Sequence, residues 1–289
     1  MRAATLETYS AAHDALKARY ARLEGNIFLD APRLAALFSS RPCLLEETES
    51  ALFLLTPRHS FHDVLFLTGD AGALPDALTA WLPAWPGEQP LRVSVIGRDP
   101  GAGALAAQFG AAGFGLVKKL LRTRLKLPES KILAAMRPFA EEVRDQLGYA
   151  RHGDEEEILE MLCESFDPMG DNLPELAEIR ERIDERCVAV VRKEGRILAL
   201  NYFGIQSGVL HSFYDVTRKE YRGGNGFFMA LAVFVHDELA TRGVSCGRSL
   251  GWRDAAQKKL LRHAKKSNQQ PDGIVIYNMS RPAASDGAA

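Results

Sequence analysis

The segment HSFYDVTRKEYRGGNGFFMALAVFVHDELA, residues 211–240, contains the residue types and spacing best suited to chemistry. A β-rich run passes through a glycine-rich turn directly into a helix-like stretch. Successive glycines let a backbone approach a ligand closely, and the free N–H groups at a helix start favour an anion. The turn at residues 223–226 therefore predicts a phosphate site, although a tight strand-to-helix connection requires the same glycines.

The strand predicted ahead of this turn supplies two candidate bases. A general base is a side chain that can accept a proton from a reacting group within hydrogen-bond reach. Strand alternation places His211, Phe213 and Asp215 on one face of the strand. His211 is the first candidate base, acting directly or through a water molecule, and Asp215 is the second. A histidine on a strand is also commonly a hydrogen-bonded structural residue, and that interpretation stays open.

Hydrophobic periodicity predicts the elements that must position these residues. Helical spacing recurs in residues 158–166, 173–183 and 227–239. Residues 186–216 are typical of three strands separated by tight turns. This order predicts a mixed α/β or α+β domain with a mixed sheet, and excludes a helical bundle or a β-sandwich. The predicted elements that follow are a strand at 245–249, a helix at 254–266 and a closing strand with the sequence GIVIYNM.

Residues 137–282 resemble a GNAT acetyltransferase domain. Gly224 and Gly226 fall where the two glycines of that family's Q/R-x-x-G-x-G/A signature fall. The first position departs from the pattern, because Tyr221 stands where Arg or Gln is usual and Arg222 is displaced by one residue. The guanidinium of Arg222 can still contact a phosphate bidentately from the displaced position.

The GNAT resemblance implies an acyl-CoA co-substrate, with acetyl-CoA as the expected one. In that family, backbone groups of the strand before the motif bind the pantetheine arm, which here are those of Asp215 and Val216. The pyrophosphate then lies on the N–H groups from Gly223 through Phe227. The cofactor-binding residues implied in this way are Asp215, Val216, Arg222, Gly223, Gly224, Asn225, Gly226 and Phe227.

The general acid of the family has no direct counterpart in this sequence. In the family, a later helix of the form N-x-x-A-x-x-x-Y ends in a tyrosine that protonates the departing thiolate, and Leu261 stands at that tyrosine position here. A thiol with a pKa of about 8.5 is a good leaving group without such an acid. Tyr277, His263 and Tyr214 are the candidates for substitution, and Tyr277 joins His211 and Asp215 as the predicted catalytic residues.

The first half of the chain is similar to the back end of a second GNAT domain. Residues 90–127 read as a strand, a short helix, AAGF and a final strand, without the glycine-rich signature. We expect a tandem architecture, with a degenerate GNAT-like N-terminal domain at 1–135 and a GNAT acyltransferase domain at 136–289. Within the first half, the sequence predicts an amphipathic helix that ends near Gly25 and a hairpin over residues 51–67.

Composition narrows the classes of partner. The net charge of −1 provides no basic field for nucleic acid or an anionic membrane. The first residues lack the features of a signal peptide, and no run approaches the length of a membrane span, so we expect a cytoplasmic protein. Four widely spaced cysteines indicate neither a disulfide framework nor a metal site.

Three functions remain open at this point. The leading interpretation is an N-acetyltransferase that moves an acetyl group from acetyl-CoA to a small-molecule or peptide amine by direct attack in a ternary complex. The second is a GNAT-fold transferase whose donor is an acyl carrier protein or an aminoacyl-tRNA. The third is a non-catalytic acyl-CoA-binding module. A homodimer is compatible with each of them.

Overall fold

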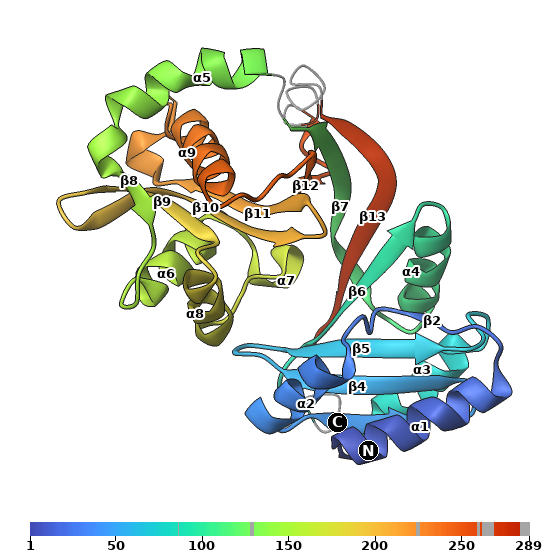
Figure 1. The fold of residues 1–289 in the computed structure, drawn as a ribbon. Coiled ribbons are helices and arrows are strands. Elements are labelled where there is room, and N and C mark those ends of the chain that lie inside the picture. The colour runs from blue at the N-terminus through green and yellow to red at the C-terminus, as the bar shows by residue number, and fades with distance from the viewer. Residues whose placement is uncertain (86, 128–129, 224–225, 259–260, 262–268, 284–289) are drawn as a thin grey trace. The chain divides into compact units, whose positions relative to one another are not determined.

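A computed structural model describes residues 1–85, 87–127, 130–223, 226–258, 261 and 269–283. The chain forms two compact units. One comprises Met1–Leu120 together with Gly273–Ala289, and the other comprises Leu121–Asp272. Each unit contains strands of a mixed sheet with helices on both faces (Figure 1). The predicted mixed α/β class is confirmed.

The first unit has the strand order β1-β3-β4-β5-β6-β13, followed by the first half of β7. Neighbouring strands pair in antiparallel fashion except β5 and β6, which are parallel. The elements are β1 (Arg2–Ala3), α1 (Leu6–Arg19), β2 (Glu24–Gly25), α2 (Ala31–Ser40), β3 (Leu44–Glu47), β4 (Ala51–Pro57), β5 (His62–Thr68), α3 (Leu74–Trp81), β6 (Leu91–Arg98), α4 (Gly101–Ala111), β7 (Gly115–Lys126) and β13 (Gln270–Arg281).

Strand β4 forms the centre of this unit because both of its faces are covered. Leu52 and Leu54 pack into the cluster beneath α1 and α2, whereas the Phe53 ring lies 5.4 Å from that of Trp81 in α3. The predicted hairpin at 51–67 is confirmed as β4 and β5. The predicted N-terminal helix is too long, because α1 ends at Arg19 and a separate short strand, β2, contains Gly25.

The last strand of the chain belongs to the first unit. In β13, Ile274–Arg281 pair with Leu91–Arg98 of β6. The strand itself was expected, but as the closing strand of the C-terminal domain. Its fully buried Asn278 accepts a hydrogen bond of 2.6 Å from the Ser94 hydroxyl of β6. An amphipathic strand can join any sheet edge that matches its pattern, so periodicity alone does not say which sheet it enters.

The division between the units differs from the boundary expected near residue 135. That residue lies inside helix α5 (Ser130–Glu142), which contains Pro138 in its interior. A proline removes one helical hydrogen bond but does not always end a helix. Instead, β7 crosses the division, since its residues to Leu120 belong to the first unit and the rest to the second.

The second unit has the strand order β8-β9-β10-β11-β12, with the second half of β7 beside β12. Helices α5 and α9 cover one face of this sheet, and α6 and α8 cover the other (Figure 1). The predicted order of two helices, three strands, helix and strand is confirmed, whereas most of the helix expected at 254–266 lies outside the described residues. The elements after α5 are β8 (Leu147–Tyr149), α6 (Glu155–Ser165), α7 (Pro168–Asp171), α8 (Leu176–Asp184), β9 (Val188–Lys193), β10 (Arg196–Gln206), β11 (Val209–Thr217), α9 (Phe227–Thr241) and β12 (Arg248–Asp254).

None of the described helices is both long enough and apolar enough to cross a membrane.

The pairing of β13 with β6 predicts energetic coupling between two residues far apart in the chain. Ser94→Ala and Asn278→Ala should each lower the free energy of unfolding by about 1–3 kcal/mol, because each leaves a buried polar partner behind. The double variant should lose about 0.5–3 kcal/mol less than the sum, since the two changes remove one shared hydrogen bond. Urea denaturation of all four proteins measures this coupling, and additive losses would contradict the pairing.

Candidate functional site

The second unit contains two parallel strands that are paired at one end only. The described pairs between β11 and β12 run from Val209 with Arg248 to Ser212 with Gly251. Strand β11 continues to Thr217, and beyond Ser212 its described pairs are with β10 alone. Where two parallel strands separate in this way, the backbone N–H and C=O groups of a strand edge can bind a strand-like ligand.

A β-bulge lies where the two strands part. Tyr214 pairs with Tyr202 of β10, but the next pair on β10 joins Phe203 to Ser212, so Phe213 is an extra residue. The rings of Phe213 and Tyr214 both contact that of Tyr202, with centroids at 6.2 and 5.7 Å. Because a bulge shifts the alternation of all later side chains, the prediction that His211 and Asp215 share a face is wrong.

The bulge brings Asp215 onto the face that bears Ser212. The Ser212 hydroxyl donates to one Asp215 carboxylate oxygen at 3.1 Å, and the Asn201 amide donates to the other at 2.5 Å. Burial raises the pKa of Asp215, while the charge of Arg253 and the two hydrogen bonds act in the opposite direction. The carboxyl is thus held rigidly in a poorly hydrated position.

These polar residues form one wall of a cavity of about 820 Å³. The cavity lies within the second unit, and its lining includes Asp215 and Arg253 beside aliphatic side chains of α5, α9 and β11. Leu133, Leu210 and Val235 are examples of the apolar lining. Its volume is in the range of small-molecule sites, and a mostly apolar pocket with a few convergent polar groups is typical of them.

His211 lies on the opposite side of the sheet from Asp215. Its ring stacks on that of Phe213, with centroids 6.2 Å apart, and the guanidinium of Arg182 lies 5.8 Å from the Phe213 ring. Burial lowers the pKa of His211, and the charges of Arg122, Arg248 and Arg182 lower it further. The imidazole is therefore neutral near physiological pH and able to accept a proton.

Two glycines of the turn have left-handed backbones. Gly223 has φ of 98° and Gly226 has φ of 60°, and α9 begins directly afterwards at Phe227. A Cβ at position 226 would lie 2.1 Å from the Phe139 ring of α5, whereas one at position 223 would meet nothing within 4 Å. Gly226 thus has a packing reason as well as a conformational one. Gly224 and Asn225 lie outside the described residues.

Two further residues predicted to bind the acyl donor, Arg222 and Val216, differ in exposure. Arg222 is exposed, and its guanidinium donates to the Thr217 carbonyl at 2.8 Å and to the Ser165 hydroxyl at 3.1 Å. These two bonds occupy part of its five N–H donors. The Val216 side chain is buried in the core beneath α6 and α8, so only its backbone faces a ligand.

The three predicted catalytic residues are divided between the two units. Tyr277 belongs to the first unit, whereas His211 and Asp215 belong to the second. The Tyr277 hydroxyl donates to Asp99 at 3.0 Å and accepts from the Lys119 ammonium at 2.7 Å. These contacts form a self-contained ionic cluster within the first unit.

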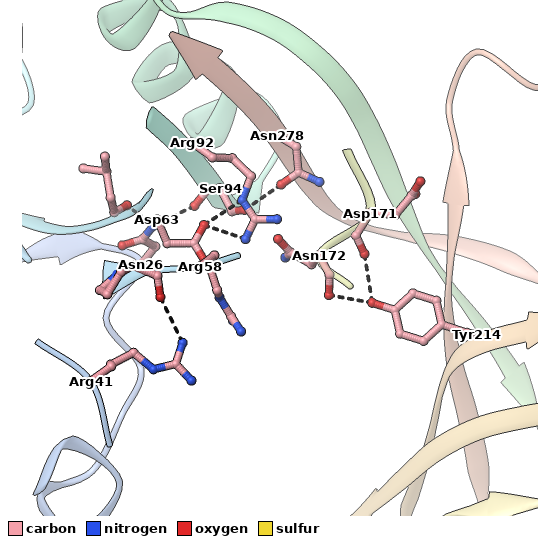
Figure 2. Close-up of polar contacts among 12 residues, drawn as sticks. Asn26, Arg41, Arg58, Asp63, Arg92, Ser94, Asp171, Asn172, Tyr214 and Asn278 are labelled. Atoms are coloured by element: carbon pink, nitrogen blue, oxygen red, sulfur yellow. Dashed lines mark hydrogen bonds and ion pairs between the residues drawn. The ribbon is translucent and has the colours of Figure 1, made fainter. Parts of the chain in front are cut away.

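Tyr214, another candidate acid, holds a loop in place. Its hydroxyl lies 2.9 Å from the carbonyl oxygen of Asp171 and 2.7 Å from that of Asn172 (Figure 2). These residues belong to the connection between α6 and α8. Asn172 has a left-handed backbone with φ of 56°. His263 lies outside the described residues.

Arg218 is a structural residue that sequence reasoning did not single out. It is buried at the end of β11, where it donates to the Ile197 carbonyl at 2.7 Å and to Glu157 of α6 at 2.7 Å. A buried charge requires such partners. The partners are distant in sequence, so no spacing signals the pair. Among the described residues, no cluster of acidic, histidine or cysteine side chains is arranged to hold a metal ion.

Comparison with known proteins gives matches at the level of structure only. No family model matches the sequence, and no curated protein matches it either. A tandem GNAT protein from the clavulanic acid biosynthesis pathway, in a form without AcCoA, matches with a TM-score of 0.55 and 12% identity over 99% of each chain. The chain has the tandem GNAT fold.

Two further GNAT structures support this fold. A GCN5-related N-acetyltransferase from Kribbella flavida matches with a TM-score of 0.57 and 10% identity over 96% of this chain and 70% of that one. One from Sphaerobacter thermophilus matches with a TM-score of 0.51 and 14% identity over 98% and 96%. At such identities the likeness to GNAT proteins establishes the fold, and the activity has to be argued from the site.

The contrast between the two turn glycines predicts unequal effects of alanine. Gly223→Ala should cost about 1–2 kcal/mol of stability, which is the cost of a left-handed alanine. Gly226→Ala should cost about 1–3 kcal/mol more, because the added methyl overpacks the site against Phe139. Denaturant unfolding measures both, and a Phe139→Ala background should remove the excess. Equal losses in the two variants would contradict the close packing.

The raised pKa of Asp215 predicts a pH-dependent stability difference. A carboxyl whose pKa is higher in the folded protein than in the unfolded chain destabilises the fold above that pKa, and the penalty vanishes at pH values below the unfolded pKa. Asp215→Asn should therefore gain in melting temperature relative to the wild type as pH rises from the unfolded carboxyl pKa of about 3.9 through the higher folded pKa. Melting curves across this range test the idea, and a constant difference would exclude it.

Proposed function

We propose that the second unit is an acyl-CoA-dependent N-acyltransferase. The observation that carries this proposal is the separation of β11 from β12 after Ser212, beyond which β11 leads through a glycine turn into the start of α9. A pantetheine arm has amide groups that can pair with a free strand edge, as an added strand would. A pyrophosphate suits the N–H groups and the positive end of the dipole at a helix start.

In this proposal the donor arm lies along β11 from Phe213 to Val216. The pyrophosphate lies at the turn, near the backbone of Gly223, Gly226 and Phe227. Arg222 is exposed beside the same turn and has N–H donors left for a phosphate oxygen. This reading gives acetyl-CoA, or another acyl-CoA, as the co-substrate.

The acceptor is a small-molecule or peptide amine that approaches the face bearing His211. The amine nitrogen attacks the thioester carbonyl, the C–S bond breaks, and the neutral imidazole of His211 accepts the proton that the nitrogen loses. The thiolate leaves without a strong acid because its pKa is about 8.5. Asp215 lies on the other face of the sheet, in the wall of the cavity, and accepts hydrogen bonds from Asn201 and Ser212.

A non-catalytic acyl-CoA-binding module is the second candidate, and one observation favours it. Tyr277, the predicted acid, is committed to Asp99 and Lys119 in the first unit. Binding of acetyl-CoA without thiol release across a panel of amines would select this candidate.

The donor site is tested best at Phe228, which is 48% exposed in the first turn of α9. Phe228→Glu places a negative charge near the proposed pyrophosphate, whereas Phe228→Gln has the same shape without the charge. Acetyl-CoA should raise the melting temperature of the wild type and of the Gln variant, because a ligand of the folded state stabilises it. The Glu variant should bind about tenfold more weakly or worse, through like-charge repulsion. No stabilisation of the wild type at millimolar acetyl-CoA would overturn the proposal.

The two candidate bases lie on opposite faces, so their variants report the direction of the acceptor. His211→Ala should lower kcat/KM for the amine by about 100-fold or more with acetyl-CoA binding retained. Asp215→Asn should act less strongly. A reversed order of effects would place the acceptor on the cavity face.

A further inference from the structure

In the first unit, as at the proposed donor site, two parallel strands pair at one end and separate beyond it. We call the gap between the separated strands a strand opening. The two strands here are β5 and β6, which pair only at His62 with Leu91 and at Asp63 with Arg92. Strand β5 pairs with β4 along one edge. Its other edge, from Val64 to Thr68, lies beyond the two pairs with β6. The backbone groups on that edge need partners, because unpaired buried groups are costly.

The connection between α1 and α2 supplies those partners. Residues Glu24 and Gly25 form β2, which pairs with Thr68 and Leu67 of β5. A Cβ at Gly25 would lie 2.0 Å from the Phe66 carbonyl oxygen. Only glycine allows the chain to approach the edge of β5 so closely.

Asn26 then links both strands of the opening. Its backbone N–H donates to the Phe66 carbonyl at 3.0 Å, and its side-chain oxygen accepts the Phe66 N–H at 2.7 Å. Its side-chain amide donates to the Val64 carbonyl of β5 at 3.2 Å and to the Ser94 carbonyl of β6 at 3.0 Å. Asn26 is 8% exposed, so these four bonds satisfy its N–H and amide groups in a buried position.

The polar residues around Asn26 are paired with one another in the same way. Asp63 accepts from Arg58 at 3.0 Å and from Arg92 at 2.6 Å, and Ser94 donates to Asn278 (Figure 2). Asp63 and Arg92, which form one of the two pairs between β5 and β6, are both buried. The α1–α2 connection is thus a hydrogen-bonded part of the sheet.

The corresponding connection of the second unit behaves differently. Between α6 and α8, Asp171 and Asn172 are held by the Tyr214 hydroxyl through their carbonyl oxygens. Among the described residues, the connection between α6 and α8 contains the short helix α7 and no strand that corresponds to β2. The two connections occupy equivalent positions in the order of elements but have different partners.

We infer that residues 24–26 occupy the strand opening of the first unit as an internal ligand, so that each chain binds a single acyl-CoA, in the second unit. The statement about acyl-CoA rests on the proposed function. The occupation of the opening does not, and it can be tested without any ligand.

Amide hydrogen exchange tests the occupied opening directly. In the wild-type protein, the amides of Asn26 and Phe66 should be as strongly protected as those in the centre of β4. Asn26→Ala should speed exchange at Phe66 by about tenfold or more, because that amide loses its acceptor. Asn26→Asp keeps an acceptor for Phe66 but turns an oxygen toward the Val64 and Ser94 carbonyls, so it should loosen the opening as well. Asn201→Ala, in the second unit, is the control and should leave Phe66 protected.

Titration calorimetry of the full chain with acetyl-CoA tests the stoichiometry. The expected value is one acetyl-CoA per chain, bound about tenfold more weakly or worse by Phe228→Glu and bound with unchanged stoichiometry by Asn26→Ala. Two sites per chain, or rapid exchange at Phe66 in the wild type, would overturn the inference. No binding at all would overturn the proposed function, and the exchange result would still decide whether the opening is occupied.

Discussion

The hydrogen-bonding needs of two parting parallel strands govern both units of this protein. Parallel neighbours that separate leave a row of backbone N–H and C=O groups on each facing edge, and such groups need partners. In the first unit Asn26 and β2 provide them from within the chain. In the second unit the described pairs between β11 and β12 end at Ser212, and the proposed ligand site lies where the two strands separate.

The bulge at Phe213 determines on which face of the sheet the candidate bases His211 and Asp215 lie. One additional residue puts Phe213 and Tyr214 against Tyr202 and returns Asp215 to the face of Ser212. The same strand therefore presents a neutral imidazole to one side of the sheet and a restrained carboxyl to the other. A regular strand would place both on one face, and the unit would then have a single functional side.

The last strand gives the tandem GNAT fold its particular connectivity. Strand β13 follows the second unit in sequence but pairs with β6 in the first, and β7 contributes to both units. The stability of the first unit therefore depends on residues at the far end of the chain. This arrangement also explains why Tyr277 is found beside Asp99 and Lys119, and not in the unit that contains His211.

The elements whose signals are local could be predicted from the sequence. Hydrophobic periodicity and turn residues predicted the β4–β5 hairpin, the three-strand meander, helix α9 and the mixed α/β class, because those signals depend on residues within a few positions of each other. Only the tertiary structure decided the position of the bulge, the sheet that β13 enters, the partners of Arg218 and the role of Asn26. Each of these depends on pairing between segments distant in sequence, and a pattern along one segment does not specify which distant edge or partner it meets.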